Sequence, residues 1–258
     1  MTSATAVPSV ALVSVEGPGG LVRLAVVVVV CAGLAAALNH WGRLGHARDD
    51  LVAAGRATVQ LTVVGLVIAA VLRSWVLTLA FVVVMLTVAS VTAGRRLVRD
   101  GPWWWAFVPV AGAAVPVSAG LVLSGLVPRQ TVAVVPVVGI LIGGAMTATT
   151  IAGRRSLDAL RTRRGEYEAA LSIGLVDRDA ALLIARDDAA LALLPGLDQT
   201  RTVGLVTLPG AFVGMLLGGA SPLQAAAVQL LVLVGLLLVQ SLAVLATLEL
   251  VSRGQLRA

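Results

Sequence analysis

The sequence predicts an all-α membrane protein that crosses the bilayer about seven times, with its N-terminus outside and its C-terminus in the cytoplasm. Hydrophobic residues make up 59% of the chain and charged residues only 12%, whereas an ordinary soluble domain has about 25% charged residues. Several uncharged runs are also long enough to cross a bilayer, which takes ~20 apolar residues in a helix. A chain of this composition is expected to fold in lipid.

Seven apolar runs are the expected spans. They comprise residues 21–38, 51–72, 75–93, 103–127, 131–152, 202–220 and 223–250. Trp103, Trp104 and Trp105 open the fourth run, as expected of the aromatic belt at a membrane–water interface. The seventh run is longer than a bilayer requires, so it is expected to tilt or protrude. Residues 1–20 are expected to form an N-terminal tail, and residues 21–258 a single transmembrane domain.

Arginine supplies every basic residue of the chain, and its distribution predicts the orientation. With the N-terminus outside, sixteen of the 19 basic residues fall on the cytoplasmic side, and only Arg23, Arg73 and Arg129 fall outside. Because cytoplasmic loops of membrane proteins are enriched in basic residues, this orientation is favoured over its inverse. The same rule explains the net charge of +6 better than a nucleic-acid partner does, and none is expected.

One long polar segment, residues 153–201, interrupts the apolar pattern. Its charges would each cost ~2.5–3.5 kcal/mol in hydrocarbon, so the segment is expected to lie in the cytoplasm. Five of its residues recur at helical spacing and predict one helix with a common face, namely Leu157, Leu160, Arg164, Tyr167 and Leu171. Gly174 is expected to cap that helix. Asp177 is expected to cap a second helix, which Pro195 and Gly196 stop.

The most distinctive motif of this segment is Glu-Ala-Ala-x-x-x-Gly, formed by Glu168, Ala169, Ala170 and Gly174. Its small residues leave room for another surface to approach, and Glu168 offers a charge to a partner. Taken alone, an Ala-rich helix that ends in glycine is common and need not bind anything. Its place in the only long polar segment of a membrane protein favours a docking element.

The glycine-rich run at residues 139–150 is a candidate part of a translocation path. Gly139 and Gly143 lie four residues apart, a spacing that lets two helices approach closely. The side chains that could line a path here are Met146, Thr147, Thr149 and Thr150. Ordinary helix packing, with each threonine bonded to its own backbone, explains the pattern equally well.

A second glycine-rich run, residues 204–222, contains Pro209 and Gly210, which are expected to kink or break the helix within the membrane. Broken helices occur there only where protein or a cavity covers the exposed backbone. Gly210 begins a stripe that continues with Gly214 and Gly218, and Met215 lies beside it. The stripe indicates either a moving, substrate-facing element or a kinked helix that packs well.

Together and in this order, these motifs resemble the family of iron-export ABC transporter permeases that includes plant aluminium-sensitivity membrane proteins. The resemblance covers most of the chain from Arg56 onward and adds Gln60 to the candidate path. Its most specific parts are residues 145–148, 168–174, 203–210 and 219–222, with Gln229 downstream.

The resemblance implies a permease that exports a metal ion such as iron, driven by a separate ATP-binding cassette subunit that docks on residues 168–174. We further expect a homodimer in the inner (plasma) membrane, surrounded by the lipid bilayer and with no cofactor. The chain departs from the family at three positions, where Asn, Gln and Asn are usual: Gly144, Met215 and Asp198. It also carries Asp187 and Asp188 in a helix that is usually basic.

The absence of lysine excludes a conventional P-loop in this chain, because that ATP-binding motif requires a lysine. The chain is therefore not expected to be an enzyme. Two alternatives to the permease are a secondary transporter and a membrane scaffold that transports nothing. Coupled carriers usually keep an ionisable residue at mid-membrane, and no Asp or Glu lies deep in an expected span. Neither the threonines nor the methionines of the candidate path have a spacing that identifies a metal.

Overall fold

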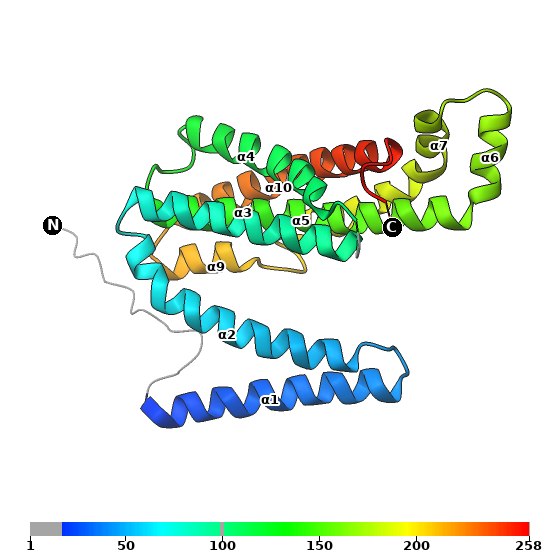
Figure 1. The fold of residues 1–258 in the computed structure, drawn as a ribbon. Coiled ribbons are helices and arrows are strands. Elements are labelled where there is room, and N and C mark those ends of the chain that lie inside the picture. The colour runs from blue at the N-terminus through cyan, green and yellow to red at the C-terminus, as the bar shows by residue number, and fades with distance from the viewer. Residues whose placement is uncertain (1–16, 99–100, 258) are drawn as a thin grey trace. The chain divides into compact units, whose positions relative to one another are not determined.

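The structure is a computed structural model that describes residues 17–98 and 101–257. Residues 1–16 of the expected tail lie outside the described residues, and residues 17–20 already belong to the first helix. The described residues form helices and turns, with one isolated bridge between Val203 and Thr207. They divide into two compact units between Arg73 and Ser74 (Figure 1). The predicted all-α membrane fold is confirmed.

The first unit is a hairpin of two helices, α1 (Gly17–Trp41) and α2 (Ala47–Val71). Beside the turn between them, the amide of Asn39 in α1 donates a hydrogen bond to the carboxylate of Asp50 in α2. The apolar side chains of both helices are largely exposed, as Val29 (70%) and Leu66 (77%) illustrate. Because soluble proteins rarely expose continuous apolar surface, both helices are suited to contact with lipid or with other spanning helices.

The second unit is a bundle built around four long helices: α3 (Trp75–Leu97), α4 (Phe107–Leu123), α5 (Thr131–Thr162) and α10 (Pro222–Ser252). α5 packs against each of the other three, and Figure 1 shows α3, α5 and α10 running along one another. Val110, Leu141 and Val239 are fully buried between them. Most of the remaining core is alanine and valine, and such small side chains let the helix axes approach closely.

Glycines of α5 allow its closest contacts. A Cβ atom added at Gly144 would lie 2.1 Å from Cδ1 of Leu236 in α10, and one at Gly153 would lie 2.6 Å from Cδ2 of Leu97 in α3. Of the predicted glycine pair, only Gly139 makes such a contact, since its added Cβ would lie 2.9 Å from Cε of Met85. An added Cβ at Gly143 meets no atom within 4 Å.

Six helices are long and apolar enough to cross a membrane, whereas the sequence predicts seven spans. The difference is the expected span at residues 202–220. α8 (Leu194–Thr202) ends there, residues 203–209 form turns, and α9 (Gly210–Leu217) has only eight residues. Eight residues reach roughly 12 Å, less than the ~30 Å hydrocarbon core. The predicted break is confirmed, because Pro209, which has no backbone N–H, immediately precedes the new helix.

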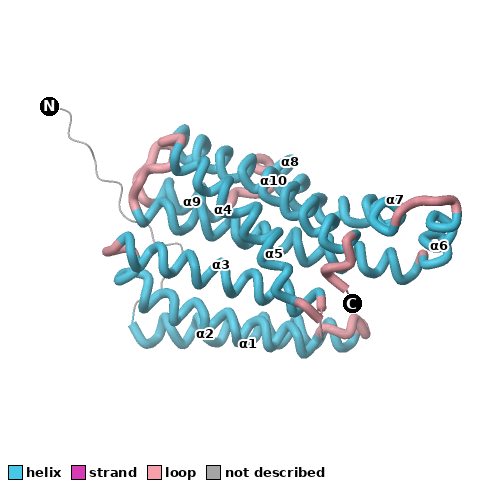
Figure 2. Tube along the Cα trace, turned by 45° about the horizontal axis from the view of Figure 1, so that its top comes forward, coloured by secondary structure: helices cyan, strands magenta, loops and turns pink. Residues whose placement is uncertain are grey.

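Helix boundaries also differ from those of the other expected spans, and two of these differences bear on the architecture. The fourth begins as a 3₁₀ turn, η1 (Trp103–Ala106), before α4. The fifth, α5, continues ten residues beyond the expected end at residue 152 because its polar extension is still packed, with Ser156 and Ala159 buried. Beyond α5 come α6 (Arg164–Ser172), α7 (Asp177–Ala190) and the 3₁₀ turn η2 (Leu191–Leu193). Figure 2 shows α6 and α7 together at one end of the bundle.

The contact between α3 and η1 predicts a sensitive position. A Cβ added at Gly94 would lie 2.2 Å from the carbonyl oxygen of Trp103, which is backbone and cannot rotate away. We expect Gly94→Ala to destabilise the protein by ~1–3 kcal/mol, the usual cost of overpacking. Gly143→Ala, also in a helix but facing open space, is the control. Thermal unfolding in detergent measures both, and equal midpoints would contradict the packing described.

The interrupted span makes the topology testable with cysteine labelling. In a Cys31→Ser background, Ser172→Cys and Ser221→Cys place single thiols on either side of residues 202–220, and both serines are exposed. Because the arginine distribution predicts that this segment crosses the bilayer, an impermeant thiol reagent should reach the two sites from opposite sides. Labelling of both from one side would mean that α9 enters the membrane without crossing it.

Candidate functional site

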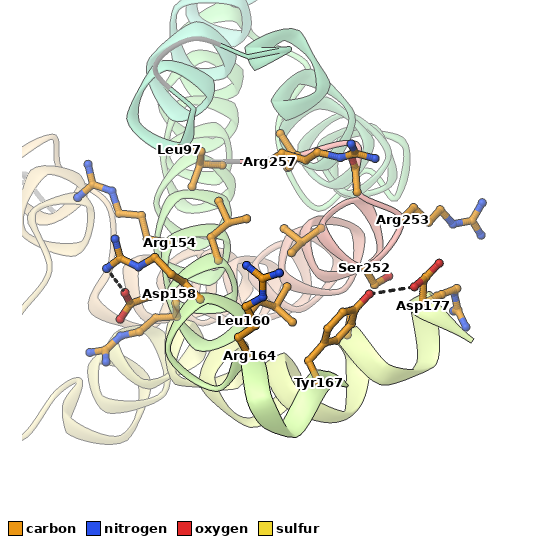
Figure 3. Close-up of a pocket in the computed structure, with 18 of the residues that line it drawn as sticks. Leu97, Arg154, Asp158, Leu160, Arg164, Tyr167, Asp177, Ser252, Arg253 and Arg257 are labelled. Carbon is orange, nitrogen blue, oxygen red and sulfur yellow. Dashed lines mark hydrogen bonds and ion pairs between the residues drawn. The ribbon is translucent and has the colours of Figure 1, made fainter. Parts of the chain in front are cut away.

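A groove with a volume of about 1470 Å³ lies at the end of the bundle where α5 passes into α6 (Figure 3). Side chains of α5, α6 and α7 line it, together with the ends of α3 and α10 and the residues after α10. The five residues predicted to share one helix face all line this groove: Leu157, Leu160, Arg164, Tyr167 and Leu171. The five side chains therefore face one groove.

The prediction that these five residues belong to one continuous helix is wrong. α5 ends at Thr162 and α6 begins at Arg164, with Arg163 between them at φ −105° and ψ 36°, outside the helical range. The guanidinium of Arg163 lies 3.1 Å from the carboxylate of Asp188 in α7. This ion pair joins the bend at Arg163 to α7. Asp188, one of the two acidic residues noted in the sequence, therefore has a role within the fold.

The four predicted docking residues have different environments. Glu168 and Ala169 are exposed, whereas Ala170 is 5% exposed and packs within the chain. The carboxylate of Glu168 lies 2.8 Å from Nε of Arg164, one turn earlier in the same helix. Both side chains are more than half exposed, so this pair contributes little to stability. It leaves Glu168 on the surface of α6 and within reach of another molecule.

Gly174 has a clear backbone role. Its φ of +97° is in the left-handed region, which glycine tolerates best. Its N–H donates to the carbonyl of Leu171, and the N–H of Leu175 donates to the carbonyl of Ala170. These two bonds form a Schellman motif, so the predicted helix cap is confirmed. A Cβ added at Gly174 meets no atom within 4 Å, so the turn, and not close packing within this chain, requires glycine.

Asp177 does not cap α7 as predicted. It is the first residue of that helix, Val176 precedes it, and no side chain caps the helix end. Asp177 instead accepts a hydrogen bond of 3.1 Å from the hydroxyl of Tyr167, which connects α6 to α7 across the groove (Figure 3). Partial burial, this hydrogen bond and the nearby negative charge all raise the pKa of Tyr167.

The prediction that Pro195 stops the second helix is also wrong. α7 ends at Ala190, and Pro195 lies in the first turn of α8.

A second connection joins α7 to α10. Arg178 contacts both carboxylate oxygens of Glu249, at 2.8 and 2.7 Å, and Glu249 also accepts a hydrogen bond from Arg253. The hydrogen bond to Glu249 and the charge of that residue raise the pKa of Arg178. Two parallel N–H···O bonds of this kind fix orientation as well as distance. The polar segment is thereby attached to the end of a spanning helix.

The candidate path residues of α5 do not share one surface. Thr147 is exposed and Met146 is half-buried, whereas Thr149 and Thr150 are buried. Thr150 donates to the carbonyl of Met146 at 2.8 Å, which supports the helix-packing alternative for this residue. Thr149 differs, because its hydroxyl has no hydrogen-bond partner in the described parts of the chain.

The other candidate path residues are also dispersed. Gln60 is exposed on α2, in the first unit, and Met215 is half-buried on α9. Added Cβ atoms at Gly210 and Gly214 meet no atom within 4 Å, so this chain alone does not pack against the glycine stripe. Pro209 lines a second cavity, of about 320 Å³, between the turns at residues 203–209 and α10.

Two glutamines of α10 were missed as candidate site residues. Gln229 lines the 320 Å³ cavity, is 6% exposed, and its Oε1 has no partner among the described residues. Gln240 is 7% exposed. Its side chain packs directly against Gly196 of α8, because its Oε1 would lie 1.9 Å from a Cβ atom added at that glycine. A polar residue amid an apolar run was the available signal, since buried amides need partners.

At Gly144, where the family usually has Asn, Leu236 already occupies the space of a side chain.

The acidic and histidine side chains of the described chain are dispersed. Among residues 17–98 and 101–257, no cluster of three or more His, Cys, Asp or Glu side chains could hold a metal ion. Asp198, another departure, is exposed and lies 3.8 Å from Arg201 of its own helix. What the described residues do offer is a groove at the end of the bundle, held by ion pairs and flanked by an exposed Glu168.

Residues 21–255 match the model of the uncharacterised protein family UPF0014. The chain is 36% identical to the UPF0014 membrane protein STAR2 of Oryza sativa subsp. japonica, over 81% of this chain and 74% of the relative. It is 33% identical to the protein ALUMINUM SENSITIVE 3 of Arabidopsis thaliana, over 83% and 79%. Identity to the "Probable iron export permease protein FetB" of Escherichia coli (strain K12) is 30%, over 85% of each. No solved structure gives a significant match.

The contact between Arg178 and Glu249 predicts how α7 is held. Arg178→Ala removes both hydrogen bonds to α10, so amide hydrogen exchange in α7 should become faster while exchange in α4 is unchanged. Arg186→Ala is the control, because Arg186 lies on the same helix, is exposed and makes no ion pair among the described residues. The same exchange rates in both variants would show that this ion pair does not fix α7.

Proposed function

The chain belongs to the UPF0014 family of membrane proteins, and we propose that it is the membrane-spanning permease of an ABC transporter, driven by a separate ATP-binding cassette subunit. In this proposal the chain has no enzymatic activity of its own. It forms the path through the plasma membrane, and a second copy of the chain completes it. Three observations support the proposal, and the exposed, anchored surface of α6 is the one that carries it.

The docking surface is the exposed side of α6 with the bend that precedes it. ATP hydrolysis in another subunit can drive transport only through an element that is rigid at one end and accessible at the other. α6 meets both conditions, since a Schellman turn ends it, Tyr167 bonds to α7, and Glu168 and Ala169 face outward. The ion pair of Arg178 with Glu249 then joins α7 to α10. A force applied to α6 would therefore be transmitted through α7 to a spanning helix.

The distribution of charge supports a permease over an ion-coupled carrier. Carriers of that kind usually keep an ionisable residue at mid-membrane. In the six long helices of the described chain, every acidic residue lies close to a helix end: Asp49, Asp50, Asp158 and Glu249. The energy for transport would then have to come from outside the chain, and an ATP-binding subunit supplies it.

The exposed glycine stripe of α9 supports a second copy of the chain as the partner inside the membrane. Residues 203–209 interrupt the helix, and non-helical backbone at membrane depth is tolerated only where protein or a cavity covers it. The N–H groups of residues 204–207 bond within residues 202–207. A second copy that covers the segment would exclude lipid from the rest of this backbone and give Gly210 and Gly214 a surface to pack against. We further propose that this chain exports iron, the activity in the name of the relative from Escherichia coli.

The docking proposal predicts that Glu168 is needed for coupling but not for folding. Because its only partner in the described chain is Arg164 of the same helix, Glu168→Ala should leave thermal stability nearly unchanged. If Glu168 pairs with a cation of the partner, its loss should weaken association by about 2–5 kcal/mol. Co-purification with the ATP-binding subunit and ATP-driven flux into vesicles measure the effect.

The matched control is Glu166→Ala, which removes the same charge from an exposed position two residues earlier on α6. Ala169→Trp is a second test, since it adds bulk to the same surface without the backbone strain that any side chain at Gly174 would introduce. Normal association and flux in both Glu168→Ala and Ala169→Trp would exclude α6 as the coupling element.

A further inference from the structure

We propose that the inner part of the groove, formed by α5 and the residues that follow α10, binds the phosphate headgroup of an anionic phospholipid. The ligand is a membrane component and not the transported substrate. Arg154, Arg155 and Arg257 are the residues that would contact the phosphate. The proposal does not depend on the ATP-binding partner. It rests on where the groove lies along the spanning helices, on its charge, and on the apolar side chains at its base.

The groove lies where the spanning helices meet water. Residues 131–153 of α5, 222–248 of α10 and 75–94 of α3 carry no charge, and each helix becomes charged at this same end, at Arg154, Glu249 and Arg95. The tryptophan run also lies here, because the guanidinium of Arg95 is 5.7 Å from the centre of the Trp103 ring. Tryptophan at helix ends marks the headgroup region of a bilayer.

The charge of the groove is unbalanced. Seven arginines and three acidic residues line it. Arg161 and Arg164 pair with acids of their own helices, and Arg178 and Arg253 share Glu249. Arg154, Arg155 and Arg257 are exposed and form no ion pair with any carboxylate of the described chain. Guanidinium groups match phosphate oxygens in geometry as well as in charge, so these three sites favour a phosphate-bearing ligand.

The floor of the groove favours a lipid over a soluble phosphate. Leu157 and Leu160 line it and are only partly buried, so their side chains are open to a ligand. They pack on a small apolar cluster that contains Leu97, Val251 and Leu256, which are themselves buried. Acyl chains fit an apolar floor of this kind, whereas a soluble phosphate gains nothing from it. Basic pockets between spanning helices are a recurrent way of binding lipid headgroups.

The arginines already make limited contacts, which leave room for a ligand. Nε of Arg154 donates to the carbonyl of Arg96 at 3.2 Å, and Arg257 donates to the carbonyl of Gly254. A guanidinium has five N–H donors, so each keeps most of its donors available. Arg154 thereby also spans from α5 to α3, and a bound phosphate would extend that connection to the residues after α10.

Native mass spectrometry of the full chain in detergent can test the proposal. The probes are phosphatidylglycerol and phosphatidylcholine with the same acyl chains, with glycerol phosphate and inorganic phosphate as soluble comparisons. We expect phosphatidylglycerol to bind more tightly than the other three. In the double variant Arg155→Gln/Arg257→Gln its binding should weaken roughly fivefold per arginine, or about 1 kcal/mol each.

The control is the double variant Arg186→Gln/Arg201→Gln, which removes the same net charge from exposed arginines outside the groove. Equal binding of the two lipids, or equal loss in the two double variants, would overturn the proposal. Soluble phosphates that bind as tightly as the anionic lipid would replace it with a free-phosphate site. If the first double variant fails to fold, Arg257→Gln alone, in the last described residues, gives the same comparison.

Discussion

Close packing of α5 against α3 and α10 is the contact on which the rest of the second unit depends. It is possible only because Gly144 and Gly153 leave space that Leu236 and Leu97 occupy. With the helices this close, the polar extension of α5 remains packed beyond the apolar run and brings α6 and α7 to the end of α10. The groove therefore exists because a spanning helix continues past the lipid without losing its neighbours.

This arrangement places two kinds of interaction at one end of the bundle. Arg178, Glu249 and the Tyr167–Asp177 bond connect the polar segment to a spanning helix, while Arg154, Arg155 and Arg257 remain without carboxylate partners. In the proposed transporter the first set would transmit movement and the second would attract anions. A permease driven by a partner outside the membrane would benefit from both, because coupling would then take place on a surface anchored at the headgroup level.

The sequence was a good guide to features that depend on local pattern. Hydrophobic runs located the long helices, Pro209 located the break, and Gly174 located a helix cap. The sequence was a poor guide where a side chain that fits a local pattern bonds instead to another part of the chain. Asp177 looked like a cap but bonds to Tyr167, and the helix expected through residue 171 bends at Arg163, which pairs with Asp188. The groove could not be foreseen, because Arg178 and Glu249 are 71 residues apart and no periodicity connects them.

The short α9 has a consequence for how the protein is made. As the chain leaves the ribosome, residues 202–220 offer no continuous helix that the insertion machinery could release into lipid by itself. α10 follows almost at once, and a capping box between Ser221 and Gln224 fixes where it starts. The two would then enter the bilayer together as a hairpin, with the strongly apolar α10 carrying in a partner that is too short to insert alone. Biogenesis of this region would then be completed only once α10 has been synthesised.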